Sequence, residues 1–499
     1  MVEDTTGNSY SASDTGDSYD TAGYKTAGHG TAHEGGGTTD QASDDTAGAS
    51  ADPAGEQTAA PGDTIASDTA GAASLPYSEP WRPVTTVTAI MISTFLMGAG
   101  TALQGSAVSM RAGLEGFPDT MIGLIMSANF VGLIIGSLTA PEVIRRVGYV
   151  RSFAAFASLC SVSALAHILW INPVVWIVFR LATGLCLSVM LVVVESWLNV
   201  SSTTYNRGRI LSIYSVMYLG SMGAGQPLLG VFSPGSFELF GVTTILISFC
   251  LVPVALMQVT GVPQATRQSP ELFKTFMRSP LAGFGTIVSG LITGATWSLA
   301  PRFGQGLGMA DGQIGLLMIL ISLGTLTLQW PLGWISDRRD RRKAILWSVG
   351  VAFVTSAVIG IMRSTGLPLY ILIFLFGGFG MPLYSLCIAL ANDQLTPEQM
   401  VHAAGAIVVY YGIGSAAGPF FASLFMSAVG PAGLFLFMSI ILALLLGTTS
   451  VRLVVAPHLP RIRASAFHVY PRTTAAAFGL LRRVKVRKRR RPGSQASTQ

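Results

Sequence analysis

The 499-residue chain has little charge for its length. Asp, Glu, Lys and Arg make up 11% of it, whereas half of the residues are apolar. A soluble protein carries about 25% charged residues, because its surface faces water. The shortage of charge therefore argues against an ordinary soluble globular protein and indicates that much of the surface faces lipid.

Cysteine and the common catalytic motifs are also scarce. The four cysteines stand singly within apolar runs, without the paired spacing of a metal site or a disulfide framework. The sequence has no Walker loop, no zinc-ligand spacing and no serine elbow. We therefore predict no enzyme activity, no metal and no cofactor. An ion gradient is a more natural energy source than ATP.

Charge is concentrated at the two ends of the chain. Residues 1–80 hold fourteen acids against the single base Lys25, and they are rich in Gly, Ala, Ser and Thr. This composition predicts a disordered acidic tail, and no basic and apolar opening indicates a cleavable signal peptide. From residue 452 onward there are twelve Lys or Arg and no acid. We expect the basic tail at 456–499 to bind anionic lipids rather than nucleic acid.

Apolar segments fill the region between the tails. Each is close to the roughly 20 residues that a helix needs to cross a bilayer, and lipid offers no partners for other backbone forms. The sequence predicts an all-α membrane protein with a six-helix bundle at 81–260, a linker at 261–280 and a second bundle at 281–455. The predicted spans are 84–108, 121–141, 152–171, 174–198, 208–232, 239–260, 281–303, 313–335, 344–362, 367–391, 402–427 and 431–455.

Basic residues in the loops predict the orientation. Thirteen Lys or Arg fall in loops of one side, against Arg111, Arg302 and Arg363 on the other. Because basic loops stay in the cytoplasm, we expect both termini and the linker there. We also expect a monomeric, multi-pass protein of the inner (plasma) membrane.

The two predicted bundles are related in sequence. Ile122–Met126 at the start of the second span matches Ile314–Met318 at the start of the eighth. Gly208–Tyr214 in the fifth span is echoed by Gly405–Tyr411 in the eleventh. Repeats in the same orientation are typical of transporters whose halves are related by an axis along the membrane normal.

One loop between the eighth and ninth spans combines a glycine, two acids and a run of bases. It reads Gly-Trp-Ile-Ser-Asp-Arg-Arg-Asp-Arg-Arg-Lys from Gly333 to Lys343. It resembles the loop signature of the major facilitator superfamily, with Asp340 in place of the usual second glycine. The resemblance implies a small-molecule transporter with a cytoplasmic gate that holds the outward-facing state together. The alternative is a positive-inside anchor. The implied gating residues are Gly333, Asp337, Arg338, Arg341 and Arg342.

The fourth span carries a further resemblance. Arg180 and Gly184 are similar to the superfamily's helix-four arginine motif, which proton-linked members tie to coupling; snorkelling of Arg180 to the outer surface is the alternative. Glu195–Asn199 and Arg207–Arg209 resemble a bacterial YcaD-like branch of the superfamily. Acids near membrane helices are typical proton carriers, although an ion pair of Glu195 with Arg207 or Arg209 is an equal alternative. The coupling candidates are Arg180, Glu195, Asp393 and Glu142, the last from the degenerate first-half loop.

Glycines and a proline between Gly220 and Gly230 resemble the fifth-helix signature of antiporters, with Gln226 replacing one glycine. This mildly favours export. An uptake permease, or a sensor or scaffold on a transporter fold, remains the alternative.

By the same resemblance, a substrate site is expected near the membrane midplane between the halves. The candidates carry few fixed charges, which favours a neutral, amphipathic or weakly cationic solute. His167 stands alone and is expected to pack rather than to relay protons. The candidate residues are Gln104, Asn129, His167, Gln226, Trp297, Gln329, Trp330 and Tyr384.

Overall fold

The computed structural model describes residues 82–202, 206–256, 272–362 and 365–455. Every regular element in these ranges is a helix, and the described ranges fall within one compact unit. The predicted tails and most of the predicted linker lie outside the described residues, so their predicted disorder and lipid binding stay predictions. The part of the chain that the structure describes is therefore all-helical, as the sequence predicted.

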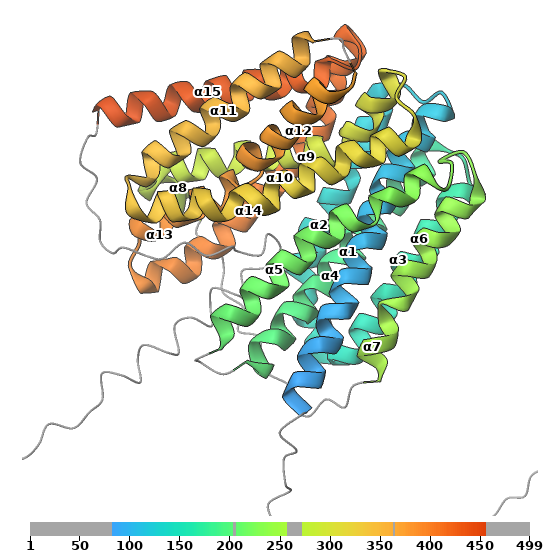
Figure 1. The fold of residues 1–499 in the computed structure, drawn as a ribbon. Helices are drawn as coiled ribbons and strands as arrows, with labels where there is room; N and C mark the ends of the chain where they lie inside the picture. Colours follow the sequence, from blue (N-terminus) through green and yellow to red (C-terminus); the bar gives the residue numbers. More distant parts are fainter. Residues whose placement is uncertain (1–81, 203–205, 257–271, 363–364, 456–499) are drawn as a thin grey trace, which may run out of the picture. The chain divides into compact units, whose positions relative to one another are not determined.

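The described part of the first half holds seven α-helices and one short 3₁₀ helix, and Figure 1 shows how the α-helices lie beside one another. Local sequence explains where the helix after Asn172 begins. The Asn172 side chain accepts hydrogen bonds from the backbone amides of Val174 and Val175, and Pro173 occupies the first turn of the helix that follows. The elements are α1 (Arg82–Leu114), α2 (Asp119–Val147), α3 (Tyr149–Leu169), α4 (Pro173–Ser201), α5 (Arg207–Ala224), η1 (Gln226–Gly230), α6 (Phe237–Phe249) and α7 (Leu251–Ala255).

The second half begins after a short helix in the predicted linker. The predicted tenth span is two helices, because the chain turns at Met381 and Pro382, and proline cannot continue the hydrogen-bond ladder of a helix. The elements are α8 (Leu272–Arg278), α9 (Pro280–Gly306), α10 (Asp311–Arg338), α11 (Arg341–Ile361), α12 (Leu367–Gly380), α13 (Leu383–Asp393), α14 (Pro397–Val429) and α15 (Gly433–Val455).

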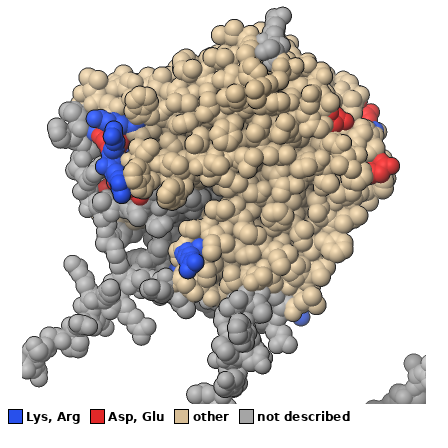
Figure 2. Space-filling view, in the orientation of Figure 1, with Lys and Arg blue, Asp and Glu red and all other residues tan. Residues whose placement is uncertain are grey.

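Ten segments of the described chain are long and apolar enough to cross a membrane. The other two predicted spans coincide with α5 and η1 and with α9, which is 27 residues long but rich in Gly, Ser and Thr. Large apolar side chains such as Trp347 and Ile361 point outward. On the face shown in Figure 2, charged side chains lie toward the ends of the helices and leave a wide uncharged band. A multi-pass membrane protein follows from these features, and the count of twelve spans stays a prediction.

Close helix packing recurs at equivalent places in the two halves. A methyl group added at Gly184 of α4 would lie 1.8 Å from the carbonyl oxygen of Asn129 on α2. A methyl group added at Gly377 of α12 would lie 2.5 Å from the carbonyl oxygen of Ile321 on α10. The second and fourth spans of each half thus meet through glycine, which allows their backbones to approach. This agreement supports the repeat that the sequence predicted.

The two halves meet at the end of the molecule where α1 and α9 finish and α2 and α10 begin. We call this the Arg302 end, and the opposite end, where α10 and α13 finish, the Asp337 end. At the Arg302 end, the guanidinium of Arg302 on α9 donates to Asp119 of α2 at 2.9 Å. Gln305 donates to the carbonyl oxygen of Met110 on α1 at 3.2 Å. Farther along, α2 packs on α14, and α5 packs on α10.

Candidate functional site

A cavity of about 170 Å³ lies between the two halves. Its walls come from α1, α2, α4 and α5 of the first half and from α9, α10, α13 and α14 of the second. Five sequence-predicted site residues line it, in two of the predicted classes. They are the substrate-lining candidates Asn129, Trp297 and Gln329 and the coupling candidates Arg180 and Glu195.

Arg180 lies inside the protein and faces this cavity. Only 4% of the residue is exposed, although it lies seven residues beyond Pro173, about 10 Å along α4 from the Arg302 end. Its Nε atom has no hydrogen-bond partner in the described structure. Because the residue is buried within the protein and lines the cavity, snorkelling to the membrane surface does not describe its position.

Glu195 lies on the same helix toward the Asp337 end. Its side chain is fully buried and accepts a hydrogen bond of 3.1 Å from the hydroxyl of Tyr214 on α5, and both residues line the cavity. The Nε of Arg207, a predicted ion-pair partner, donates to Asn199 at 2.7 Å. Glu195 is thus the one coupling candidate that is both acidic and at the cavity wall.

The remaining substrate-lining candidates lie away from the cavity wall. Gln104 donates to the hydroxyl of Thr183 at 3.3 Å, and Gln226 accepts from Ser106 at 2.8 Å. Tyr384 packs on Tyr411, which does line the cavity, with 4.6 Å between ring centroids.

Two aromatic predictions had contrasting outcomes. The placement of Trp330 at the site was wrong, because the residue is 74% exposed and points away from the protein interior. Its neighbour Gln329 faces inward and donates to Ser385 at 3.3 Å. His167 packs between Trp176 and Phe179, and its Nδ1 lies 2.6 Å from the carbonyl oxygen of Ser163.

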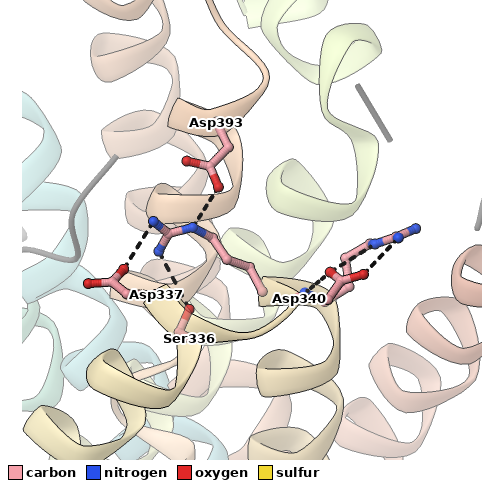
Figure 3. Close-up of polar contacts among 6 residues, drawn as sticks. Ser336, Asp337, Asp340 and Asp393 are labelled. Atoms are coloured by element: carbon pink, nitrogen blue, oxygen red, sulfur yellow. Dashed lines mark hydrogen bonds and ion pairs between the residues drawn. The ribbon is translucent and has the colours of Figure 1, made fainter. Parts of the chain in front are cut away.

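Two of the predicted gating residues, Asp337 and Arg341, form an ion cluster with the coupling candidate Asp393 at the Asp337 end (Figure 3). The guanidinium of Arg341 lies 2.6 Å from Asp393 and 3.1 Å from Asp337, and it reaches the hydroxyl of Ser336 at 3.5 Å. The side chains of Arg341 and Asp393 are 5% and 8% exposed. Arg341 therefore joins the ends of three helices of the second half, α10, α11 and α13.

Two neighbouring bases have separate partners. Arg342 pairs with Asp340 at 2.9 Å, and Asp340 also caps α11 by accepting from the backbone amide of Arg342. Arg338 lies over the ring of Trp334, 4.0 Å from its centroid. Gly333 is buried within α10.

Glu142, the first-half coupling candidate, lies at the surface. It pairs with Arg145 and Arg146 of its own helix, each at 2.5 Å, and its side chain is 43% exposed. It stands apart from the cavity wall, and α2 alone supplies these two partners.

The ion pair between Arg302 and Asp119 was not predicted from the sequence. Both residues were visible at the ends of predicted spans, but 183 positions separate them in the chain. Only the packing of α2 beside α9 brings an acid of one half to a base of the other. Complementary charges on the same predicted side of the membrane were the available signal.

The comparisons with known proteins agree with this architecture. A family model described as Major Facilitator Superfamily matches residues 90–283 and 282–489. The chain belongs to this superfamily. The prediction of a YcaD-like member is confirmed by relatives such as the "Uncharacterized MFS-type transporter YcaD" of Salmonella heidelberg (strain SL476), which is 26% identical over 340 residues, or 68% of this chain and 88% of the relative.

A second relative carries the same superfamily name, and a solved transporter structure shares the fold. An "Uncharacterized MFS-type transporter" of Yersinia pestis (strain Pestoides F) is 27% identical over 355 residues, 70% of this chain and 90% of the relative. The crystal structure of the nucleoside transporter NupG matches 74% of this chain and 98% of its own, with a TM-score of 0.62 and 11% identity. At that identity the likeness shows the fold alone, and the family identifies a membrane transporter.

Proposed function

We propose that the chain is a secondary active transporter of a small solute and works by alternating access. The observation that carries the proposal is a cavity lined by both halves, with ion and hydrogen bonds between the halves at the Arg302 end. Rocking α1–α7 against α9–α15 around this cavity would expose it to each side of the membrane in turn.

The excess of bases in the loops supports a cytoplasmic position for the Asp337 end. In that orientation, the interhalf bonds close the outer side, and the structure corresponds to an inward-facing state. The cluster of Arg341, Asp337 and Asp393 would then meet the first half when the cytoplasmic side closes. The protein would act as a monomer in the inner membrane, and its basic tail at 456–499 would bind anionic lipids.

Proton coupling through Glu195 is the proposed energy source. Glu195 is buried, acidic and at the cavity wall, and acids in such places are typical of proton relays in transporters. Glu195→Gln should abolish flux driven by a pH gradient while sparing solute exchange. Glu142→Gln is the matched control, because Glu142 lies at the surface with its own helix arginines. Unchanged gradient-driven flux in Glu195→Gln would remove it as the carrier.

The experiment for transport itself uses the purified full chain in liposomes, with an imposed pH gradient and a library of metabolites and drugs. Flux of a solute establishes a transporter, and its direction relative to the gradient separates the export that the fifth helix favours from uptake. Specific binding without flux under any gradient would favour a sensor or scaffold instead.

A further inference from the structure

We infer that the solute carries a carboxylate, which the guanidinium of Arg180 binds in the part of the cavity nearer the Arg302 end. The inference rests on the proposed function in one respect, namely that the bound solute is the one transported. It also departs from the neutral or weakly cationic solute that the sequence favoured, because the structure places a fixed positive charge at the cavity wall.

The surroundings of Arg180 do not neutralise its charge. Among the described residues, no carboxylate lies within ion-pair distance of Arg180, and its Nε has no hydrogen-bond partner. A guanidinium is always charged and presents five donors. Placing such a group inside a membrane protein is costly unless a partner or a water-filled cavity receives it. A residue that is 96% buried and faces a cavity is therefore suited to a ligand that supplies the missing charge.

The backbone opposite Arg180 leaves room for this ligand. Gly105 of α1 lines the same cavity, and a methyl group added there would lie 3.9 Å from Nη2 of Arg180. Gln104, which precedes Gly105, donates through Nε2 to the hydroxyl of Thr183, and its Oε1 has no hydrogen-bond partner among the described residues. At Gly105 the guanidinium thus faces a wall without a side chain.

Hydrogen-bond donors elsewhere on the wall fit an oxygen-rich solute. The indole Nε1 of Trp297 can only donate, and it has no partner in the described structure. Trp297 lies nine residues before the end of α9, about 13 Å from the Arg302 end, which is close to the depth of Arg180 in the other half. Buried hydroxyls without partners lie deeper on the same wall. They belong to Ser188, Thr293 and Ser415.

The one acid on the cavity wall is too far away to serve as the partner of Arg180. Glu195 follows it by fifteen residues on α4, which is about 22 Å along the helix. A small solute held by Arg180 and Trp297 would leave Glu195 available for a proton. The two charges of α4 thus have different places and, on this inference, different tasks.

The test measures binding rather than flux, so that it stands apart from the proposed function. Purified full-length protein in lipid nanodiscs is titrated with monocarboxylates from acetate to benzoate and indole-3-acetate, each paired with its amide. Calorimetry and the shift in Tm report the binding. We expect at least one acid to bind tenfold or more tightly than its amide, and Arg180→Gln to remove this preference. Arg180→Lys should retain only part of it, because Lys lacks the bidentate fork.

A second readout guards against a purely structural role. Without ligand, Arg180→Gln should have a Tm equal to or above that of the parent, because the substitution removes a buried charge that has no partner. A variant that fails to fold, amides that bind as well as acids, or a series in which no acid binds would each overturn the inference. Transport of a neutral or cationic solute would also overturn it while leaving the transporter proposal intact. Binding of an acid without flux would support the carboxylate site and contradict the transporter proposal.

Discussion

At the scale of single residues, the buried ion cluster at the Asp337 end and the surface pair of Glu142 differ in what they contribute. Removing one partner of a buried ion pair leaves the other charge uncompensated, which costs about 3–5 kcal/mol. Arg341 would keep Asp337 after loss of Asp393. For Asp393→Asn we therefore expect a loss at the lower end of that range.

Thermal unfolding of the purified protein checks this expectation. Asp393→Asn should lower Tm clearly, whereas Glu142→Gln should leave it nearly unchanged, because exposed ion pairs contribute little. Equal Tm values for both variants would show that Arg341 and Asp393 are not coupled in the folded protein.

The sequence identified most charged residues of interest, but it could not assign their partners. Asp337 and Arg341 are one turn apart in the chain, so their pairing was within reach of sequence reasoning. Asp393 is 52 residues from Arg341, and only the packing of α13 beside α11 joins them. The surroundings of the Arg180 side chain were likewise not predictable from the sequence, since a side chain near a helix end can point to lipid, to water or to a cavity.

At the scale of helices, close approach at glycine positions the cavity wall. Gly184 lies one turn beyond Arg180, and its contact with the Asn129 carbonyl sets the spacing of α4 and α2. An added methyl group at 1.8 Å forces the two backbones apart. Overpacking of this kind costs about 1–3 kcal/mol. Gly184→Ala should therefore lower Tm and weaken ligand binding together.

Gly447 of α15 provides the matched control. It is also helical, but a methyl group there would meet nothing within 4 Å. Because Ala has the higher helix propensity, by about 1 kcal/mol, Gly447→Ala should keep or raise Tm. A loss in both variants would mean that glycine in these helices serves something other than close packing.

Helix existence was the most predictable level of the fold. Long apolar runs predicted the helices to within six residues at their ends, because lipid allows little else. Breaks within spans were harder to foresee. The turn at Met381 and Pro382 and the 3₁₀ segment after Gly225 depend on proline together with local packing, and apolar runs continue through both.

At the scale of the whole molecule, the pair of Arg302 and Asp119 should bias the protein toward the state seen here. Asp119→Asn removes the ionic part of a contact that joins the two halves. We expect maleimide labelling at the Arg302 end to become faster in cavity-facing cysteine variants. The double charge swap Asp119→Arg with Arg302→Asp should restore slow labelling.

Glu115→Gln serves as the control for that experiment. Glu115 pairs with Arg111 at 2.6 Å at the same end, but Arg111 lies in the last turn of α1 and Glu115 directly follows that helix, so both belong to the first half. Its loss should leave labelling unchanged. Equal acceleration by Glu115→Gln and Asp119→Asn would point to general loosening rather than to a bond between halves.

The two-bundle arrangement itself followed from the repeat in the sequence, whereas the conformational state did not. The end at which the two halves contact each other depends on small energy differences between interfaces, such as one ion pair. No local sequence pattern indicates these differences. The central claim is that the halves rock around the cavity, so that one end closes as the other opens.

Electron–electron distance measurements between spin labels test this claim most directly. All four native cysteines are buried and would be replaced. One label pair, at Leu114 and Val429, reports the Arg302 end, and another, at Val147 and Ile335, reports the Asp337 end; all four residues are exposed. In Asp119→Asn with Arg302→Gln, the first distance should lengthen and the second should shorten. Distances that stay at the parent values, or that change in the same direction at both ends, would contradict alternating access in this protein.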